Sequence, residues 1–232
     1  MDTLACLNTR YSVRKYSTKP VDFDMLVEIV HAGTRAPSAG NTQDFRFIIV
    51  TNKTVIEELA YHCMEQIWIA SAPVVIVAIA ATDLAEQRYG LRGKRLYVTQ
   101  STAAATQNMM LAAHALGLGS CWIGAFEEQF IADKFGIPPG YRPQALLTVG
   151  YPDKLQEPRV EKKRLHELLY FNRFGMPFKH PELYFNEYAE FVRKQAKNEV
   201  FIPLKALASR VKTYLSNKKK GQESQEEETK KK

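Results

Sequence analysis

The chain has 232 residues, of which 45% are hydrophobic, and its formal net charge is +7. This length and composition favour one domain with a sizeable core and an appendage. The longest strongly apolar run, residues 73–81, is too short to span a bilayer, and residues 1–10 lack the apolar stretch of a signal peptide, so we expect no membrane partner. Three scattered cysteines exclude a disulfide scaffold and a zinc site, and they indicate reduced thiols in the cytoplasm.

Helical and extended patterns alternate in the first half of the chain. Residues 2–8 predict a short helix, and apolar residues recur with helical spacing over 25–33. Residues 45–50 are β-branched or aromatic and predict a strand, and residues 55–64 predict a further helix. The continuous apolar run at 74–80 is typical of a buried central strand.

The second half continues in the same way. A long alanine-rich helix is predicted over 94–116, a short strand over 120–123, a helix over 127–135 and a strand over 144–149. Glycines follow both helices, as is common at helix ends. Because these elements lack the regular alternation of βαβ units, we expect an α+β fold in which helices flank a central mixed sheet.

The end of the chain differs in composition from the rest. We expect a principal domain over 1–175, a helical arm over 176–216 and a disordered charged tail over 217–232. An aromatic stripe in the arm, Tyr184, Phe185, Tyr188 and Phe191, would bury area within the chain or across a subunit boundary. The helical patterns behind these expectations lie at 165–170, 182–197 and 202–215.

The basic charge raises the question of a nucleic-acid partner. No recognisable reading module is present, and the run Glu226 to Glu228 in the tail would repel phosphates. We therefore expect no specific nucleic-acid partner, although weak, salt-sensitive contact through Lys218 to Lys220 stays open. Removal of the tail is expected to leave the function of the principal domain unchanged.

The first chemically informative motif is Arg-Tyr-Ser-Val-Arg-Lys-Tyr at residues 10–16. Arg10 and Arg14 flank the Ser12 hydroxyl. A guanidinium presents a planar fork that matches a pair of phosphate oxygens, and a serine adds another donor. By itself this motif is equally consistent with a solvated basic turn.

Two further motifs make a ligand site more plausible. The first, Arg-Ala-Pro-Ser-Ala-Gly-Asn-Thr-Gln at 35–43, has small residues that would let backbone amides reach a planar ligand, and Asn41 and Gln43 offer both donors and acceptors. The second, Gly-Leu-Gly-Ser-Cys-Trp-Ile-Gly at 117–124, permits a tight turn and close approach of a ligand. Each alone is also explained as a loop or as structural punctuation.

Taken in order, the motifs resemble those of the FMN-dependent nitroreductase family. Members look like RRSVR-x-F, then PSAxNxQPW, then QN-LLAA-x-x-GLG-x-x-W-x-G, then GYP and a basic cluster. The matching segments here are residues 10–16, 37–43, 107–124, 150–152 and 162–164. The resemblance covers roughly residues 1–175, and it implies a nitroreductase-like three-layer fold.

The resemblance also implies a role for each matching residue. Arg10, Ser12 and Arg14 would contact the FMN phosphate, ribityl chain and ring edge, and Lys162 and Arg164 would add a basic contact to phosphate. The partner subunit of a homodimer would supply Pro37, Ser38, Ala39, Asn41 and Gln43, with FMN at the subunit interface. The residues expected along the isoalloxazine are Cys121, Trp122, Ile123 and Gly124.

The implied activity is hydride transfer from NADH or NADPH, through FMN, to a nitroaromatic, quinone or similar small acceptor by ping-pong exchange. The cofactor supplies the redox chemistry, so no side chain need act as a nucleophile, and we expect Cys121 to be a small buried thiol. Alternatives are a same-fold enzyme of reductive dehalogenation or FMN breakdown, a flavin-binding protein without turnover, and an RNA-associated protein. Asp44 and Phe45 depart from the family's Pro-Trp, which leaves the acceptor open.

Overall fold

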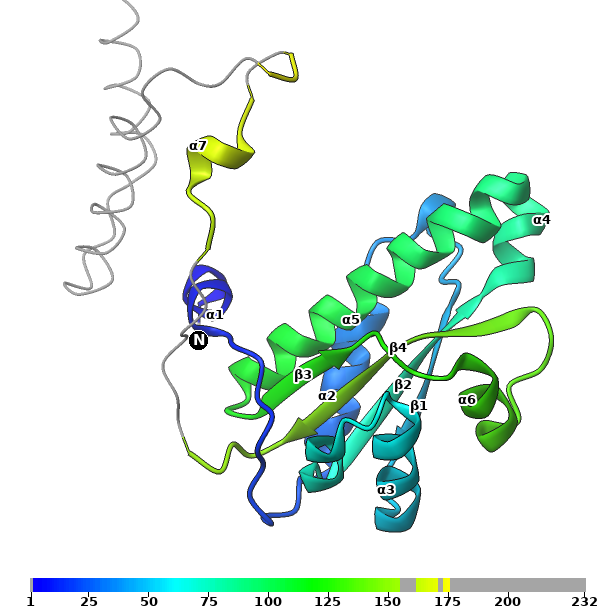
Figure 1. Cartoon of the computed structure of the whole chain (residues 1–232). Coiled ribbons are helices and arrows are strands. Elements are labelled where there is room, and N and C mark those ends of the chain that lie inside the picture. The colour runs from blue at the N-terminus through cyan, green and yellow to red at the C-terminus, as the bar shows by residue number, and fades with distance from the viewer. Residues whose placement is uncertain (1, 155–161, 171–172, 176–232) are drawn as a thin grey trace, which may run out of the picture. The chain divides into compact units, whose positions relative to one another are not determined.

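The structure is a computed structural model that describes residues 2–154, 162–170 and 173–175. It divides the chain into two units, Met1–Arg159 and Val160–Lys232, each of which is considered by itself. Figure 1 shows the elements in chain order. The expected arm and tail, with their aromatic stripe, lie outside the described residues, so the boundaries at 175 and 216 stay predictions.

The first unit is built on a four-stranded sheet in the order β1-β2-β4-β3. The strands are β1 (Phe45–Val50), β2 (Val74–Ala81), β3 (Gly119–Ile123) and β4 (Tyr141–Gly150). Every residue of β2 is buried, because strands pair with both of its edges and helices cover both of its faces. The prediction of a buried central strand is confirmed.

The sheet differs from the mixed sheet that we expected. The pairs β1–β2, β2–β4 and β3–β4 are all antiparallel. β2 and β3 run in the same direction, but β4 lies between them, so their parallel orientation produces no parallel ladder. Among the described residues, the one parallel bridge outside the strands joins Ser12 to Ser120.

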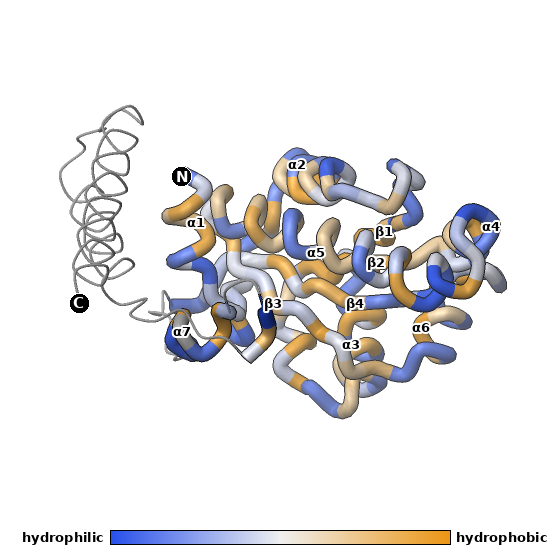
Figure 2. Tube along the Cα trace, turned by 90° about the horizontal axis from the view of Figure 1, so that it is seen from above, coloured by the Kyte–Doolittle hydropathy of each residue, from blue (hydrophilic) through white to orange (hydrophobic). Residues whose placement is uncertain are grey.

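Two helical layers cover the sheet, which confirms the three-layer α+β fold (Figures 1 and 2). Alternate side chains of a strand point to opposite faces. Val75, Val77 and Ile79 pack with residues of one layer, whereas Val74 and Ile76 pack with residues of the other. The first layer holds α3 (Lys53–His62), the 3-10 turn η2 (Ile67–Ser71) and α6 (Glu128–Phe135), and the second holds α2 (Phe23–Thr34) and α5 (Val98–Ala115).

Local signals in the sequence explain where the helices begin and end. Asp2 accepts hydrogen bonds from the first turn of α1 (Thr3–Thr9), and Asp22 and Asn52 cap α2 and α3 in the same way. Gly136 ends α6 with φ 59°, a left-handed conformation that a side chain would disfavour. The second unit contains one described helix, α7 (Leu165–Leu168), within the predicted 165–170.

One helix was absent from the sequence prediction. α4 (Thr82–Arg92) follows β2 directly, and a π-helical segment, η3 (Gly93–Tyr97), joins it to α5. Its polar composition gives no apolar stripe, and Gly90 interrupts it with φ 58°. The predicted helix over 94–116 therefore contains the π-helical turn at its start. No helix in the described part of the chain is long and apolar enough to cross a membrane.

Asp44, which departs from the family pattern, lies immediately before β1. Its side chain is fully buried, and neither carboxylate oxygen has a hydrogen-bond partner among the described residues. Its backbone carbonyl accepts a 2.8 Å hydrogen bond from Ala81 N–H, which ties it to the end of β2. Asp44 is therefore part of the interior of this chain and does not belong to the exposed surface of the loop before β1.

Replacement of Asp44 by asparagine is expected to stabilise the protein. A buried charge without a partner costs more than a buried amide, so we predict a gain of about 1–3 kcal/mol in the free energy of unfolding. Urea denaturation measures this change, with Glu28→Gln, an exposed carboxylate in the middle of α2, as the control expected to change by under about 0.5 kcal/mol. A loss of stability in Asp44→Asn would show instead that the fold compensates this charge.

Candidate flavin site

The segment that carries the two arginines runs along the edge of the sheet at β3. Ser12 forms a parallel bridge with Ser120, and Val13 N–H donates a 3.0 Å hydrogen bond to Ser120 O. Farther on, Tyr16 forms an antiparallel bridge with Pro152, just after β4. Backbone contacts with Ser120, which follows Gly119, and with Pro152 therefore hold the first motif in an extended conformation.

Gly119 makes this close approach possible. A Cβ atom at position 119 would lie 2.5 Å from Val13 Cγ2 and 2.8 Å from Val13 Cβ. No real side chain tolerates such a distance, so any residue other than glycine would push the segment off β3. The glycine of the third motif thus serves the placement of the first motif.

Arg10, Ser12 and Arg14 all influence the pKa of Cys121 in β3. Burial raises the pKa of the Cys121 thiol, while the charge of Arg14, a hydrogen bond with Ser12 and the charge of Arg10 act in the opposite direction. Only 2% of Cys121 is exposed. The structure therefore brings the first and third motifs together, and the thiol is the small buried group that the sequence predicted.

The two guanidinium groups are suited to an anionic ligand. Arg10 Nη1 is buried and has no hydrogen-bond partner among the described residues. Arg14 is exposed, and its Cζ lies 5.8 Å from the centroid of the Trp68 ring, in cation–π geometry. A buried donor without an acceptor is costly, and a phosphate oxygen would satisfy it. Nothing in the sequence marks Trp68 as a candidate site residue, because it is one aromatic residue in an apolar stretch.

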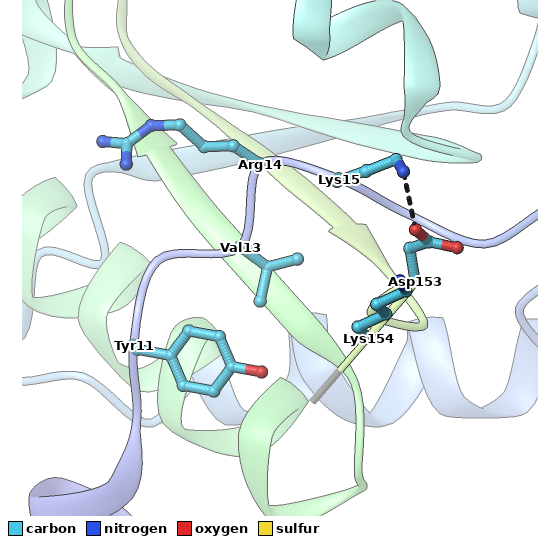
Figure 3. A pocket seen from close by; sticks show the side chains of 6 residues that line it. All are labelled: Tyr11, Val13, Arg14, Lys15, Asp153 and Lys154. Carbon is cyan, nitrogen blue, oxygen red and sulfur yellow. Dashed lines mark ion pairs between the residues drawn. The ribbon is translucent and has the colours of Figure 1, made fainter. Parts of the chain in front are cut away.

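A pocket opens beside the same segment (Figure 3). Its lining residues are Tyr11, Val13, Arg14, Lys15, Asp153 and Lys154. Lys15 Nζ and an Asp153 oxygen are 2.8 Å apart, and their hydrogen bond raises the pKa of Lys15 and lowers that of Asp153. Arg14 and Lys154 take part in no ion pair that the described residues form, so the pocket has a positive surplus.

Sequence reasoning missed the pocket residues Lys15, Asp153 and Lys154. The signal for them was present, because Asp153 and Lys154 directly follow the Gly-Tyr-Pro motif at 150–152. The sequence does not reveal that the backbone of residues 151–153 pairs with that of residues 15–17. This pairing includes a 3.0 Å hydrogen bond from Asp153 N–H to Lys15 O.

The other residues of the third motif differ in what they can offer a ligand. Trp122 is 36% exposed, and Gly124 is exposed beside it. The Ile123 side chain is buried in the core layer that contains α3 and α6, so only its backbone is available. These three residues extend the candidate site along β3.

The second motif lies at the opposite edge of the sheet. Residues 38–43 precede β1, with Asn41 at φ 56° and Gln43 at φ 48°, and the 3-10 turn η1 (Ala39–Asn41) lies inside the loop. Three strand spacings and about six residues of strand rise separate this loop from Cys121, roughly 25 Å. Within one chain, therefore, the structure does not bring Pro37, Ser38, Ala39, Asn41 and Gln43 to the first motif.

Contacts from α4 hold this loop in place. A Cβ atom at Gly40, where φ is 53°, would lie 1.9 Å from the Tyr89 hydroxyl, and Arg88 Nη1 donates a 3.2 Å hydrogen bond to Gly40 O. Ser38 Oγ accepts a 2.9 Å hydrogen bond from Gln43 N–H across the loop. The loop is thus a fixed, exposed structure at the sheet edge.

The remaining predicted residues, Lys162 and Arg164, belong to the second unit. Both are exposed, and Arg164 N–H donates a 3.3 Å hydrogen bond to Glu167 Oε1 at the start of α7. The expectation that they contact a phosphate stays a prediction.

The sequence and the fold of this chain are similar to those of proteins from one known family. Residues 7–73 and 66–151 match the sequence model of the nitroreductase family. A protein of Methanothermobacter thermautotrophicus, named for NADH dehydrogenase/NAD(P)H nitroreductase activity, is 31% identical over 156 residues, which are 66% of this chain and 78% of that protein.

Solved structures of nitroreductases have folds similar to that of this chain. A nitroreductase family protein of Streptococcus pneumoniae is similar with a TM-score of 0.67 at 25% identity, over 73% of this chain and 100% of that one. An FMN-dependent nitroreductase of Clostridium difficile is similar with a TM-score of 0.63 at 25% identity, over 74% of this chain and 99% of that one.

Alanine at position 119 is expected to dislodge the arginine segment. Because its Cβ would overlap Val13, we predict that Gly119→Ala lowers the free energy of unfolding by about 1–3 kcal/mol. Gly124→Ala is the matched control, since the nearest atom to its Cβ would be Trp122 Nε1 at an ordinary 3.7 Å. Urea denaturation compares the two variants, and equal stability would mean that Val13 is not packed on Gly119.

Proposed function

Since this chain belongs to the nitroreductase family, we propose that it passes electrons from NADH or NADPH through FMN to a nitroaromatic, quinone or similar small acceptor. Membership makes the chain an NAD(P)H-dependent oxidoreductase whose cofactor is FMN. The acceptor class and the ping-pong order, in which donor and acceptor use the same space in turn, are parts of the proposal.

One observation carries the assignment of the site: the segment between Arg10 and Arg14 pairs with β3 at Ser120, and a guanidinium nitrogen of Arg10 is buried without a partner among the described residues. These residues fit a bound phosphate and the polar edge of a planar ring. Arg10 would hold the FMN phosphate, Ser12 would donate to the cofactor, and Arg14 would face the ring edge. When bound, FMN supplies the redox chemistry by taking up hydride from the nicotinamide and passing electrons to the acceptor.

The protein's own groups would act by position and charge. The positive charge of Arg14, held over Trp68, favours negative charge that develops beside it. Burial raises the pKa of the Cys121 thiol, which disfavours the thiolate form that a nucleophile requires. The positive surplus of Arg14 and Lys154 in the neighbouring pocket would favour anionic parts of the cofactor or of the electron donor.

The position of the second motif supports a homodimer. Its loop is held by α4 at the edge of the sheet opposite the arginines, so a site that uses both motifs needs two copies of the chain. A second copy would bring its loop of 37–43 to the cofactor bound at Arg10 and Arg14. The homodimer with FMN at the subunit interface is therefore part of the proposal.

Removal of either arginine is expected to weaken FMN binding. Each would donate charge-assisted hydrogen bonds to FMN, so we predict that Arg10→Ala and Arg14→Ala raise the dissociation constant of FMN roughly 10- to 100-fold. Titration of apoprotein with FMN, followed by flavin fluorescence, measures this. Arg142→Ala is the control, because Arg142 pairs with Glu128 near the start of β4, six residues along the strand from Thr148, which pairs with Cys121.

The reconstituted enzyme tests the reaction itself. Initial rates of NAD(P)H oxidation with a quinone at several fixed concentrations are expected to give parallel lines in double-reciprocal plots, as ping-pong exchange requires. Wild-type affinity in both arginine variants would refute the site, and intersecting lines would refute the ping-pong order.

A further inference from the structure

Tyr16 closes the arginine motif, and it carries a hydroxyl that the family pattern, with phenylalanine there, lacks. The side chain is 6% exposed. Its hydroxyl lies 2.8 Å from Val13 O and 2.7 Å from Thr148 Oγ1, and Thr148 Oγ1 lies 3.3 Å from Cys121 O. The Tyr16 hydroxyl therefore joins the arginine segment to β4, and Thr148 extends this chain of contacts to β3.

The two hydroxyl groups of this chain of contacts carry enough protons for Tyr16 to donate to Val13 O. The two hydroxyl groups carry two protons for three contacts. When Tyr16 donates to Val13 O, Thr148 donates to the Tyr16 oxygen, because the 2.7 Å contact between the two hydroxyl groups needs a proton, and the 3.3 Å contact to Cys121 O then carries none. Val13 O has a donor in this arrangement, and Thr148, which is fully buried, is satisfied as well.

The hydroxyl acts on the peptide group that precedes Arg14. Val13 N–H is fixed by Ser120 O at 3.0 Å, and the Val13 carbonyl is fixed by Tyr16. The Val13 backbone is thus held on both sides, and the Val13–Arg14 peptide has one orientation. The direction in which Arg14 leaves the segment follows from that orientation.

The ring of Tyr16 is held by contacts that do not need the hydroxyl. The residue bridges to Pro152, the next residue, Ser17, donates its N–H to Tyr151 O at 2.9 Å, and Gly150 leaves room for the ring. A Cβ at Gly150 would lie 2.9 Å from Tyr16 Cδ1. Loss of the hydroxyl alone would therefore leave the ring packed while releasing the Val13 carbonyl.

We propose, on the basis of the function proposed above, that Tyr16 is a positioning residue of the flavin site. Its hydroxyl fixes the Val13–Arg14 peptide between β3 and β4 and so sets where Arg14 and Ser12 are presented to FMN. Tyr16 does not touch the cofactor, and its effect passes through the backbone of Val13.

Tyr16→Phe tests the proposal, because it removes the hydroxyl and keeps the ring. We expect the FMN dissociation constant of the apoprotein to rise about five- to tenfold. We also expect the Val13 amide to exchange its hydrogen faster in the apoprotein, a readout that requires no bound FMN. Tyr151→Phe is the matched control, since among the described residues the Tyr151 hydroxyl makes only a 3.7 Å contact to Met25 Sδ, and both readouts should stay at wild-type values.

The outcomes separate this proposal from the proposed function. If wild type binds FMN and Tyr16→Phe matches it in affinity and Val13 exchange, the positioning role is overturned and the function stands. A lower urea midpoint with unchanged FMN affinity would also overturn it, because that is the behaviour of a purely structural hydroxyl. If the wild-type apoprotein binds no FMN, the proposed function fails, and the flavin-site role fails with it.

A second variant keeps the test decisive if Tyr16→Phe does not fold. Thr148→Val removes the other hydroxyl of the chain with little change of volume. It is expected to weaken FMN binding and to speed Val13 exchange in the same direction, to a smaller extent, because Tyr16 still reaches Val13 O. Wild-type values for both readouts would overturn the proposal.

Discussion

The docking of residues 12–16 onto the edge of β3 is the interaction on which the rest of the site depends. Val13 lies against Gly119, where any side chain would overlap it, and its N–H bonds to Ser120. This packing places the segment that carries Arg10, Ser12 and Arg14 beside Ser120, the residue before Cys121. Motifs that are more than 100 residues apart in the sequence thereby form one candidate site. Gly119 has no reactive side chain, but the space that it leaves for Val13 determines where the arginine segment lies.

The order of strands imposes a second constraint. Because β1 and β3 form opposite edges, the loop before β1 cannot complete the site at β3 within the same chain. α4 holds that loop through Arg88 and Tyr89, so the loop is presented as a fixed surface. A cofactor site that needs both motifs is incomplete in one copy, and under the proposed function the association of two copies would supply the missing half. FMN binding and dimerisation would then both depend on the position of the two motifs at opposite edges of the sheet.

Much of the fold could be predicted because local rules govern it. The continuous apolar run at 74–80 predicted β2, and the glycine after residue 135 predicted the end of α6. α4 was missed because a polar helix with an interrupting glycine has no apolar period. The antiparallel sheet was missed because the insertion of β4 between β2 and β3 depends on the whole topology, which no local pattern encodes.

The candidate site divides in the same way. Arg10, Ser12 and Arg14 were predicted from residue types that suit a phosphate, and the structure gathers them. Trp68, which lies against Arg14, and the Lys15–Asp153 pair were not predicted, because they depend on contacts between distant segments. The burial of Asp44 was likewise hidden in the sequence, where an acidic residue in a loop suggests exposure.

The most direct test of the account is complementation between two defective subunits. Arg10→Ala disables the arginine motif, and Asn41→Gly removes the loop amide at a position whose φ of 56° glycine accepts readily. Differently tagged variants are co-expressed, and the mixed dimer is purified and titrated with FMN. If the site joins the arginines of one copy to the loop of the other, the mixed dimer has one site of wild-type affinity and one doubly defective site. Two weakened sites, with none of wild-type affinity, would show that both motifs act within one chain and would contradict the account.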